Sequence, residues 1–363
     1  MKVIHMKNLW VFVIAFLISL LVMPLVVRFA NKNGIVDKPN GRKIHKKPVP
    51  LLGGAAIFMG CIVPFLIFSQ IDLKVVSIVI ASAVLVVVGM FDDIYDIKAK
   101  KKLIVQILCA ALVVGAGIRV NISEYITDNV YLAFLIDGVI SMCWIIGIIN
   151  AVNLIDGLDG LAGGVSFIAS NAFMIILGRE GLDYVGYIIA LSLAGAILGF
   201  LFYNFYPAKV FMGDMGSTFI GFLLAVLGII ALDIPENPAS IVAPIIILAV
   251  PIFDTGLAIL RRIAQRQPLF SADKNHLHHR LITKGFSQRQ AVFIIYGLAV
   301  LAALVGVIVD VKQYFYFGVI VIGFLMLLGI LINFGGLFRI KKFMGKTYSE
   351  MVSSKEGKTY IGG

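Results

Sequence analysis

The amino-acid sequence predicts an all-α protein that crosses a membrane many times. Of its 363 residues, 60% are hydrophobic and only 14% are charged, and the mean hydropathy is +1.00. Soluble domains are about 45–50% apolar and about 25% charged. A water-soluble fold could not cover so much apolar surface, and long apolar runs recur along the whole chain.

Apolar runs that are long enough, or nearly long enough, to span a bilayer define the expected helices. The first run continues to about Ala30, which is too long for a signal peptide, and no small-residue cleavage site ends it. The expected helices cover residues 8–30, 51–70, 74–91, 103–118, 130–150, 161–178, 184–203, 217–232, 240–260, 291–309 and 314–335. The chain therefore has about eleven transmembrane helices, or ten if one short run does not span. We expect one transmembrane domain over residues 1–345 and a polar tail over residues 346–363.

Basic residues predict the orientation of these helices. Of the 31 lysines and arginines, 25 lie in or beside one set of connections and six lie on the opposite set. Because basic residues are enriched in cytoplasmic loops, the first set is expected in the cytoplasm, with the N-terminus outside and the C-terminus inside. Topology and anionic headgroups also account for the net charge of +11, so we expect no nucleic-acid partner.

Three carboxylates lie at the cytoplasmic end of the third expected helix. Asp92 and Asp93 are adjacent, and Asp96 would lie one helical turn further on. Adjacent carboxylates at a membrane edge repel each other and are costly to desolvate, so they suit a bound cation or proton-accepting groups. The alternative is a solvated loop start that nearby lysines at 98 and 100–102 neutralise.

A second polar segment, residues 150–160, reads Asn-Ala-Val-Asn-Leu-Ile-Asp-Gly-Leu-Asp-Gly between two apolar helices. Asp156 and Asp159 are three residues apart, so one helical turn would point both side chains the same way. The glycines would permit a close approach of backbone to a ligand. An Asx-type turn is the alternative, although a turn does not need this many polar side chains next to lipid.

The third segment places Asp214 between two glycines just before an expected helix. This carboxylate could cap that helix, or it could bind Mg²⁺, which prefers one or two carboxylates together with phosphate oxygens and water. The two other acidic groups are predicted on the same face, and this favours the metal.

Most of the histidines are also predicted in cytoplasmic loops. His276, His278 and His279 precede Arg280, and they would suit a transition metal or an anion; without a neighbouring cysteine we favour phosphate. The loop over 37–48 is basic, as topology alone would require, and the Gly53–Gly54 pair after it could let backbone approach a ligand.

Two further carboxylates, Asp137 and Asp254, lie within expected apolar helices and are therefore functional candidates. Asp254 lies two turns before Arg261 and could simply pair with a charge in the bundle. Asp137 is the weaker candidate.

Together, four segments resemble one family. They are DDIYD at 92–96, NAVNLIDGLDGLAGG at 150–164, NFYPAKVFMGDMGS at 204–217 and HLHHRL at 276–281. In this order they are similar to the polyprenyl-phosphate N-acetylhexosamine-1-phosphate transferases of the bacterial WecA/TagO type. The resemblance implies transfer of GlcNAc-1-phosphate from UDP-GlcNAc to undecaprenyl phosphate, with release of UMP, at the cytoplasmic face of the cell membrane. By the same resemblance, this transfer would start the synthesis of a lipid-linked envelope glycan such as teichoic acid or O-antigen.

The resemblance also implies roles for residues and a cofactor, Mg²⁺ or Mn²⁺. Asp214, together with Asn153, matches the metal site. The catalytic positions are Asp92, Asp93, Asp156, Asp159 and His279, and the substrate-binding positions are Asn204, Phe211, His276, His278, Arg280, Lys47, His45 and Asp96. The expected partners are UDP-GlcNAc, undecaprenyl phosphate, membrane lipid and a second copy of the chain in a homodimer.

Several alternatives stay open. The donor could be another UDP-N-acetylhexosamine, or phospho-MurNAc-pentapeptide as in a sister family, although Asp96 favours the amino-sugar branch. Transfer could be direct, or it could pass through an aspartyl intermediate. An ion-coupled transporter is the rival class, but it would show paired repeats and a binding site near the bilayer midplane.

Overall fold

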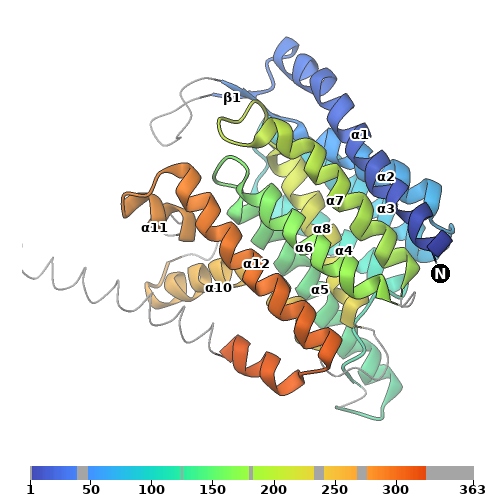
Figure 1. The fold of residues 1–363 in the computed structure, drawn as a ribbon. Helices are drawn as coiled ribbons and strands as arrows, with labels where there is room; N and C mark the ends of the chain where they lie inside the picture. The colour runs from blue at the N-terminus through green and yellow to red at the C-terminus, as the bar shows by residue number, and fades with distance from the viewer. Residues whose placement is uncertain are drawn as a thin grey trace, which may run out of the picture.

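The computed structural model describes residues 2–38, 48–123, 126–179, 183–232, 241–267 and 276–323, with side chains from Leu9 onward. His45, Lys47 and the tail from residue 346 lie outside the described residues. The described chain is a bundle of helices with one pair of very short strands (Figure 1). The first half contains α1 (Lys2–Lys32), β1 (Val36–Asp37), β2 (Val49–Pro50), α2 (Gly53–Phe68), α3 (Leu73–Tyr95), α4 (Ala99–Gly115) and α5 (Val130–Ile155). The second half contains α6 (Leu161–Leu177), α7 (Tyr184–Asn204), α8 (Gly213–Leu232), α9 (Ala243–Ile247), α10 (Ala249–Ala264), α11 (Leu277–Thr283) and α12 (Gln288–Lys312), and residues 315–323 are again helical.

Six helices in the described part of the chain are long and apolar enough to cross a membrane. They lie at Leu9–Lys32, Leu73–Tyr95, Val130–Ile155, Tyr184–Asn204, Gly213–Leu232 and Gln288–Lys312. Two shorter apolar helices, α2 and α6, pack among them. The protein is therefore an all-α, multi-pass membrane protein, as the sequence predicts. The number of eleven spans and their orientation stay predictions.

Polar residues mark where several of these helices begin. The Asp72 carboxylate accepts a hydrogen bond from the Val75 N–H at 2.8 Å, and Asn129 and Asp183 cap α5 and α7 in the same way. Ser287 forms a capping box with Gln290 at the start of α12. Each cap accepts hydrogen bonds from N–H groups that the helix itself leaves unpaired. Losing such a cap lowers the stability of the protein by about 1 kcal/mol.

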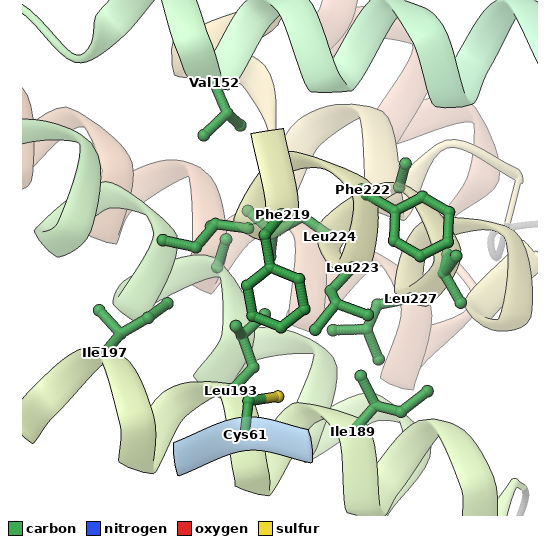
Figure 2. Close-up of a cluster of buried hydrophobic side chains, with 14 of the residues drawn as sticks. Cys61, Val152, Ile189, Leu193, Ile197, Phe219, Phe222, Leu223, Leu224 and Leu227 are labelled. Carbon is green, nitrogen blue, oxygen red and sulfur yellow. The ribbon is translucent and has the colours of Figure 1, made fainter. Parts of the chain in front are cut away.

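Helix α8 lies at the centre of the bundle, and 89% of its membrane-spanning window is buried by other helices. Figure 2 shows its side chains, Phe219 and Leu223 among them, gathered with Cys61 of α2 and Leu193 of α7. Lipid tails are as apolar as these side chains, so close packing rather than exclusion of water holds such helices together.

Glycines provide some of that close packing. A Cβ at Gly195 of α7 would lie 2.3 Å from the Phe12 carbonyl oxygen of α1. Helices α1 and α7 therefore touch backbone to backbone, as small residues permit in membrane bundles.

The helix expected over 240–260 is instead divided at Leu248 into α9 and α10. Pro251 has no N–H to donate to the carbonyl of Ile247, so the hydrogen-bond ladder is interrupted there. Helix α10 continues to Ala264, beyond the predicted end, and carries Asp254, Arg261 and Arg262 into the functional end of the bundle.

Candidate active site

Four helices bring acidic and amide side chains to one end of the bundle. Helices α3, α5 and α7 end there, and α8 begins there. Asn153 at the end of α5 donates to the Ser217 Oγ of α8 at 2.8 Å, and Asp93 of α3 contacts the first turn of α8. The structure therefore brings together the three polar segments that the sequence predicts, at 92–96, at 150–160 and around Asp214.

Lys102 joins two of the predicted carboxylates. Its Nζ lies 2.7 Å from Oδ2 of Asp92 and 2.8 Å from Oδ2 of Asp214. Asp92 is buried and also accepts the Ile97 N–H at 2.6 Å. Two carboxylates from separate helices thus share one cation, which reduces the repulsion between them.

Asp93 has a different neighbour, the N-terminus of α8. Its two oxygens accept the backbone N–H groups of Asp214 at 2.8 Å and of Met215 at 3.2 Å. The sequence suggested that Asp214 could cap this helix, but α8 begins at Gly213, so Asp214 lies within the first turn. The cap comes from another helix, and it fixes α3 against α8.

Glycines allow this contact. Gly213 has a left-handed φ of 68°, and a Cβ there would lie 2.3 Å from Oδ2 of Asp93. A Cβ at Gly89 would lie 2.4 Å from the Met215 Cα, so α3 reaches the backbone of α8 directly.

Asp156 follows the end of α5 and is half-buried. Burial, followed by the nearby charges of Asp214, Asp93 and Asp159, raises the pKa of its carboxyl to about 7. The prediction that Asp156 and Asp159 share one helical turn is wrong, because the helix ends at Ile155 and a non-helical turn follows. Asp156 nevertheless lies close to the other carboxylates.

Asp159 and Asn204 connect two loops. The Asp159 Oδ2 accepts the Ala208 N–H at 2.9 Å. The buried Asn204 amide accepts from the Gly160 N–H at 2.9 Å and donates to the Val210 carbonyl at 2.8 Å. These side chains position the loops, and the direct substrate roles predicted for them are not tested by these contacts.

The histidine segment reaches the same place through α11. A Cβ at Gly157 would lie 2.4 Å from Nε2 of His278, so this ring rests on the loop beside Asp156. The His278 and His279 rings are 4.2 Å apart. Burial, followed by the charge of His279, lowers the pKa of His278 to about 4, so its ring is neutral at pH 7.

Arg280 adds positive charge beside these rings. Burial, followed by the charge of nearby Arg261, lowers the pKa of Arg280. Such a pair suits an anion better than a metal ion, in line with the phosphate interpretation.

The Gly53–Gly54 pair serves the protein rather than a ligand. The Gly53 N–H donates to the Phe211 carbonyl at 2.9 Å, and a Cβ at Gly54 would lie 2.4 Å from the Gly216 nitrogen. The expectation that these glycines approach a ligand is therefore replaced by a packing role. The same contacts hold the backbone of half-buried Phe211 at the entrance to α8.

Three other predicted positions differ from expectation. Asp96 does not continue the helix, because α3 ends at Tyr95 and Asp96 is an exposed, left-handed C-cap with a φ of 52°. Asp137 accepts N–H groups of Ile122 and Ser123 at the opposite end of the bundle. Asp254 pairs across the bundle with His276 and also accepts the Leu277 N–H at the start of α11.

The carboxylates fit a hard divalent cation by their chemistry. Among the described residues, no three His, Cys, Asp or Glu side chains are arranged at metal-binding distances. Asp214 and Asp156, with Asn153 beside them, nonetheless offer the oxygen ligands that Mg²⁺ prefers. Lys102 already holds the carboxylates of Asp92 and Asp214 next to one positive charge.

Two residues of this site have no predicted site role. Lys102 is predicted only as one of four lysines that could neutralise the carboxylates at 92–96, whereas its ammonium group contacts both Asp92 and Asp214. Tyr296 of α12 donates from its hydroxyl to the Gly160 carbonyl at 2.5 Å. No local pattern distinguishes Tyr296 from the other aromatic residues of an apolar helix.

This geometry defines a membrane enzyme whose acidic and basic groups converge at one end of a helical bundle. The family model for glycosyl transferase family 4 matches residues 75–232, which include every acidic position described above from Asp92 to Asp214. The chain belongs to glycosyl transferase family 4, and its relatives in this family are named polyprenyl-phosphate N-acetylglucosamine-1-phosphate transferases.

Individual relatives agree with this assignment. A probable undecaprenyl-phosphate N-acetylglucosaminyl 1-phosphate transferase of Bacillus subtilis is 39% identical over 295 residues, which cover 78% of this chain and 81% of the relative. An undecaprenyl-phosphate alpha-N-acetylglucosaminyl 1-phosphate transferase of Haemophilus influenzae is 33% identical, covering 82% and 84%. A decaprenyl-phosphate N-acetylglucosaminephosphotransferase of Mycolicibacterium smegmatis is 33% identical, covering 75% and 73%.

Proposed function

We propose that the protein transfers GlcNAc-1-phosphate from UDP-GlcNAc to undecaprenyl phosphate, releasing UMP and forming undecaprenyl-diphosphate-GlcNAc. The observation that carries this proposal is the meeting of Asp92, Asp214 and Lys102 at one end of the bundle. A soluble nucleotide and a lipid phosphate can meet only at a membrane surface, where such a site lies. The names of the relatives support N-acetylglucosamine as the sugar and undecaprenyl phosphate as the lipid acceptor.

In the proposed reaction, an oxygen of the lipid phosphate attacks the β-phosphorus of the donor. The bond from that phosphorus to the bridging oxygen breaks, and UMP leaves with the electron pair. The second pKa of a phosphate monoester is about 6, so the attacking group is mostly a dianion at pH 7 and needs no strong base. Asp92 would accept the proton from the minor fraction of lipid phosphate that is still a monoanion.

The surrounding charges supply most of the catalysis in this scheme, because phosphoryl transfer depends mainly on positioning and charge neutralisation. Lys102 would balance a phosphate oxygen, and His279 and Arg280 would contact the diphosphate from α11. Phe211 would stack on the uracil. Asp214, with Asn153 and Asp156, would hold Mg²⁺ or Mn²⁺, which when bound neutralises phosphate charge.

The orientation belongs to the same proposal. The distribution of basic residues supports an orientation in which α3, α5 and α7 end at the cytoplasmic face of the cell membrane. UDP-sugars would then reach the site from the compartment where they are made.

The test is a reconstituted assay. Purified protein, Mg²⁺, undecaprenyl phosphate and sugar-labelled UDP-GlcNAc should yield UMP and labelled lipid in equal amounts. Parallel reactions with UDP-GalNAc and with UDP-MurNAc-pentapeptide identify the donor. If none of the donors gives labelled lipid, the transferase proposal is wrong. A labelled phospho-GlcNAc adduct on the protein without lipid would establish the two-step route.

A further inference from the structure

A buried carboxylate on α10 holds the start of α11. Oδ1 of Asp254 accepts the Leu277 N–H at 2.7 Å, and Oδ2 lies 2.9 Å from Nδ1 of His276. Asp254 is 8% exposed and His276 is 4% exposed, so the pair is shielded from solvent. Bonds between buried groups are costly to lose, and this pair therefore fixes where α11 begins.

The position of α11 decides where the histidine rings lie. The His276 and His278 rings are nearly parallel with centroids 5.9 Å apart, and His278 contacts His279. His278 in turn rests on Gly157, next to Asp156. An unbroken series of contacts thus leads from Asp254 to the carboxylates, although Asp254 itself contacts none of them among the interactions of the described residues.

We propose that Asp254 is a positioning residue, which sets the place of α11 and the orientation of its histidines over the loop at Gly157. The proposal rests on the proposed function for its kinetic consequence, because His279 and Arg280 are taken to contact the donor diphosphate. It does not rest on that function for its structural consequence.

The orientation of the His276 ring follows from the same contact. A carboxylate only accepts hydrogen bonds, so Nδ1 of His276 carries a proton and, in the neutral ring, Nε2 is the acceptor. An asparagine at position 254 can still accept the Leu277 N–H. Its amide would then face Nδ1 with N–H groups, which favours the opposite tautomer.

Two variants separate these effects. Asp254→Asn keeps the bond to α11 but changes the partner of His276, and Asp254→Ala removes both bonds. Asp137→Asn is the matched control, because Asp137 is also buried and also accepts two backbone N–H groups, at the opposite end of the bundle. Substituting a partner that orients a metal-bound histidine typically costs about 10–100-fold in affinity or activity, and we take that range as the expectation for this pair.

The kinetic experiment measures kcat and KM for both substrates in the reconstituted assay. We expect Asp254→Asn to lower kcat/KM for UDP-GlcNAc by about 10-fold or more, with KM for undecaprenyl phosphate unchanged. Asp137→Asn should keep wild-type values for both substrates. Wild-type kcat/KM in Asp254→Ala, or a rise in KM for undecaprenyl phosphate equal to that for UDP-GlcNAc, would overturn the positioning role.

A second measurement does not need transferase activity. Diethyl pyrocarbonate modifies accessible histidines, and mass spectrometry quantifies each site on the folded, detergent-solubilised protein. We expect buried His278 to react slowly in the wild type and in Asp137→Asn, and several-fold faster in Asp254→Ala. Equal reaction rates would refute the proposal even if the wild type transferred no sugar, whereas an inactive wild type with faster His278 modification in Asp254→Ala would refute only the proposed function.

Discussion

Lys102 and Asp214 are 112 positions apart in the sequence, yet their charged groups lie 2.8 Å apart at the shared end of α4 and α8. The same ammonium group contacts Asp92. Two carboxylates from different helices are thus held around one ammonium group. This arrangement predicts how the two sides of this contact respond to substitution.

Removing a carboxylate should stop the reaction. We expect Asp214→Ala and Asp92→Asn each to lower kcat by at least about 100-fold, because the first would lose the proposed ligand of the divalent cation and the second the proposed proton acceptor that also positions Lys102. The reconstituted assay measures this directly. Asp72→Asn is the control, since Asp72 only caps the far end of α3 and should cost no more than about 1 kcal/mol of stability. Near-normal activity in both site variants would refute the site assignment.

Removing the lysine should have opposite effects on metal binding and on catalysis. Lys102→Met deletes a positive charge between Asp92 and Asp214, so Mn²⁺ should bind the substrate-free protein about threefold to tenfold more tightly. The kcat should fall, because a phosphate oxygen loses its partner. Isothermal titration and the transfer assay measure the two quantities. Lys101→Met, at the exposed neighbouring position, should change neither.

Metal binding should depend on pH through Asp156. A pKa of about 7 means that this carboxyl is still largely protonated at pH 6 and mostly ionised at pH 8. Only the ionised form binds a cation well, so the apparent Mn²⁺ affinity should rise about tenfold over this interval. Asp156→Asn should show a flatter profile. An equally steep rise in that variant would assign the proton to another group.

The glycine contact at α2 should be intolerant of a methyl group. A Cβ at Gly54 would collide with the backbone of Gly216, so Gly54→Ala should destabilise the protein by about 1–3 kcal/mol. Thermal unfolding in detergent measures the change. Gly147→Ala, where a Cβ would meet no atom within 4 Å, should be neutral or slightly stabilising. A lower melting temperature in the control alone would contradict this account.

Chemical labelling tests the orientation. In a variant without Cys61, Cys109 and Cys143, single cysteines at the exposed positions Lys101→Cys and Asp128→Cys lie at opposite ends of the bundle. A membrane-impermeant maleimide should label position 101 only in inverted vesicles. It should label position 128 in intact spheroplasts. The reverse pattern would place the site outside the cell.

The sequence predicted the helices well because each depends on a local run of apolar residues. The expected helices at 130–150, 161–178 and 184–203 correspond closely to α5, α6 and α7. The division at Leu248 was missed, since a proline within an apolar run can kink a helix or end it. The difference depends on packing that no single run encodes.

The site was predictable in composition but not in its connections. Asp92, Asp156 and Asp214 stood out because carboxylates next to lipid are costly without a partner. That Asp93 caps a distant helix, and that Asn204 joins two loops, depends on contacts across the bundle. Lys102 was indicated only as one of four lysines that could neutralise the segment at 92–96, and its contact with Asp214 could not be predicted because it joins positions 112 residues apart.

The approach of Gly89 to the backbone of Met215 has one more consequence. At Gly89 no side chain separates α3 from α8, and one turn further on the Asp93 carboxylate ties α3 to the first turn of α8, so this junction is held rigidly. The acidic end of the enzyme is therefore preorganised. A rigid inhibitor of complementary shape would lose little conformational entropy on binding.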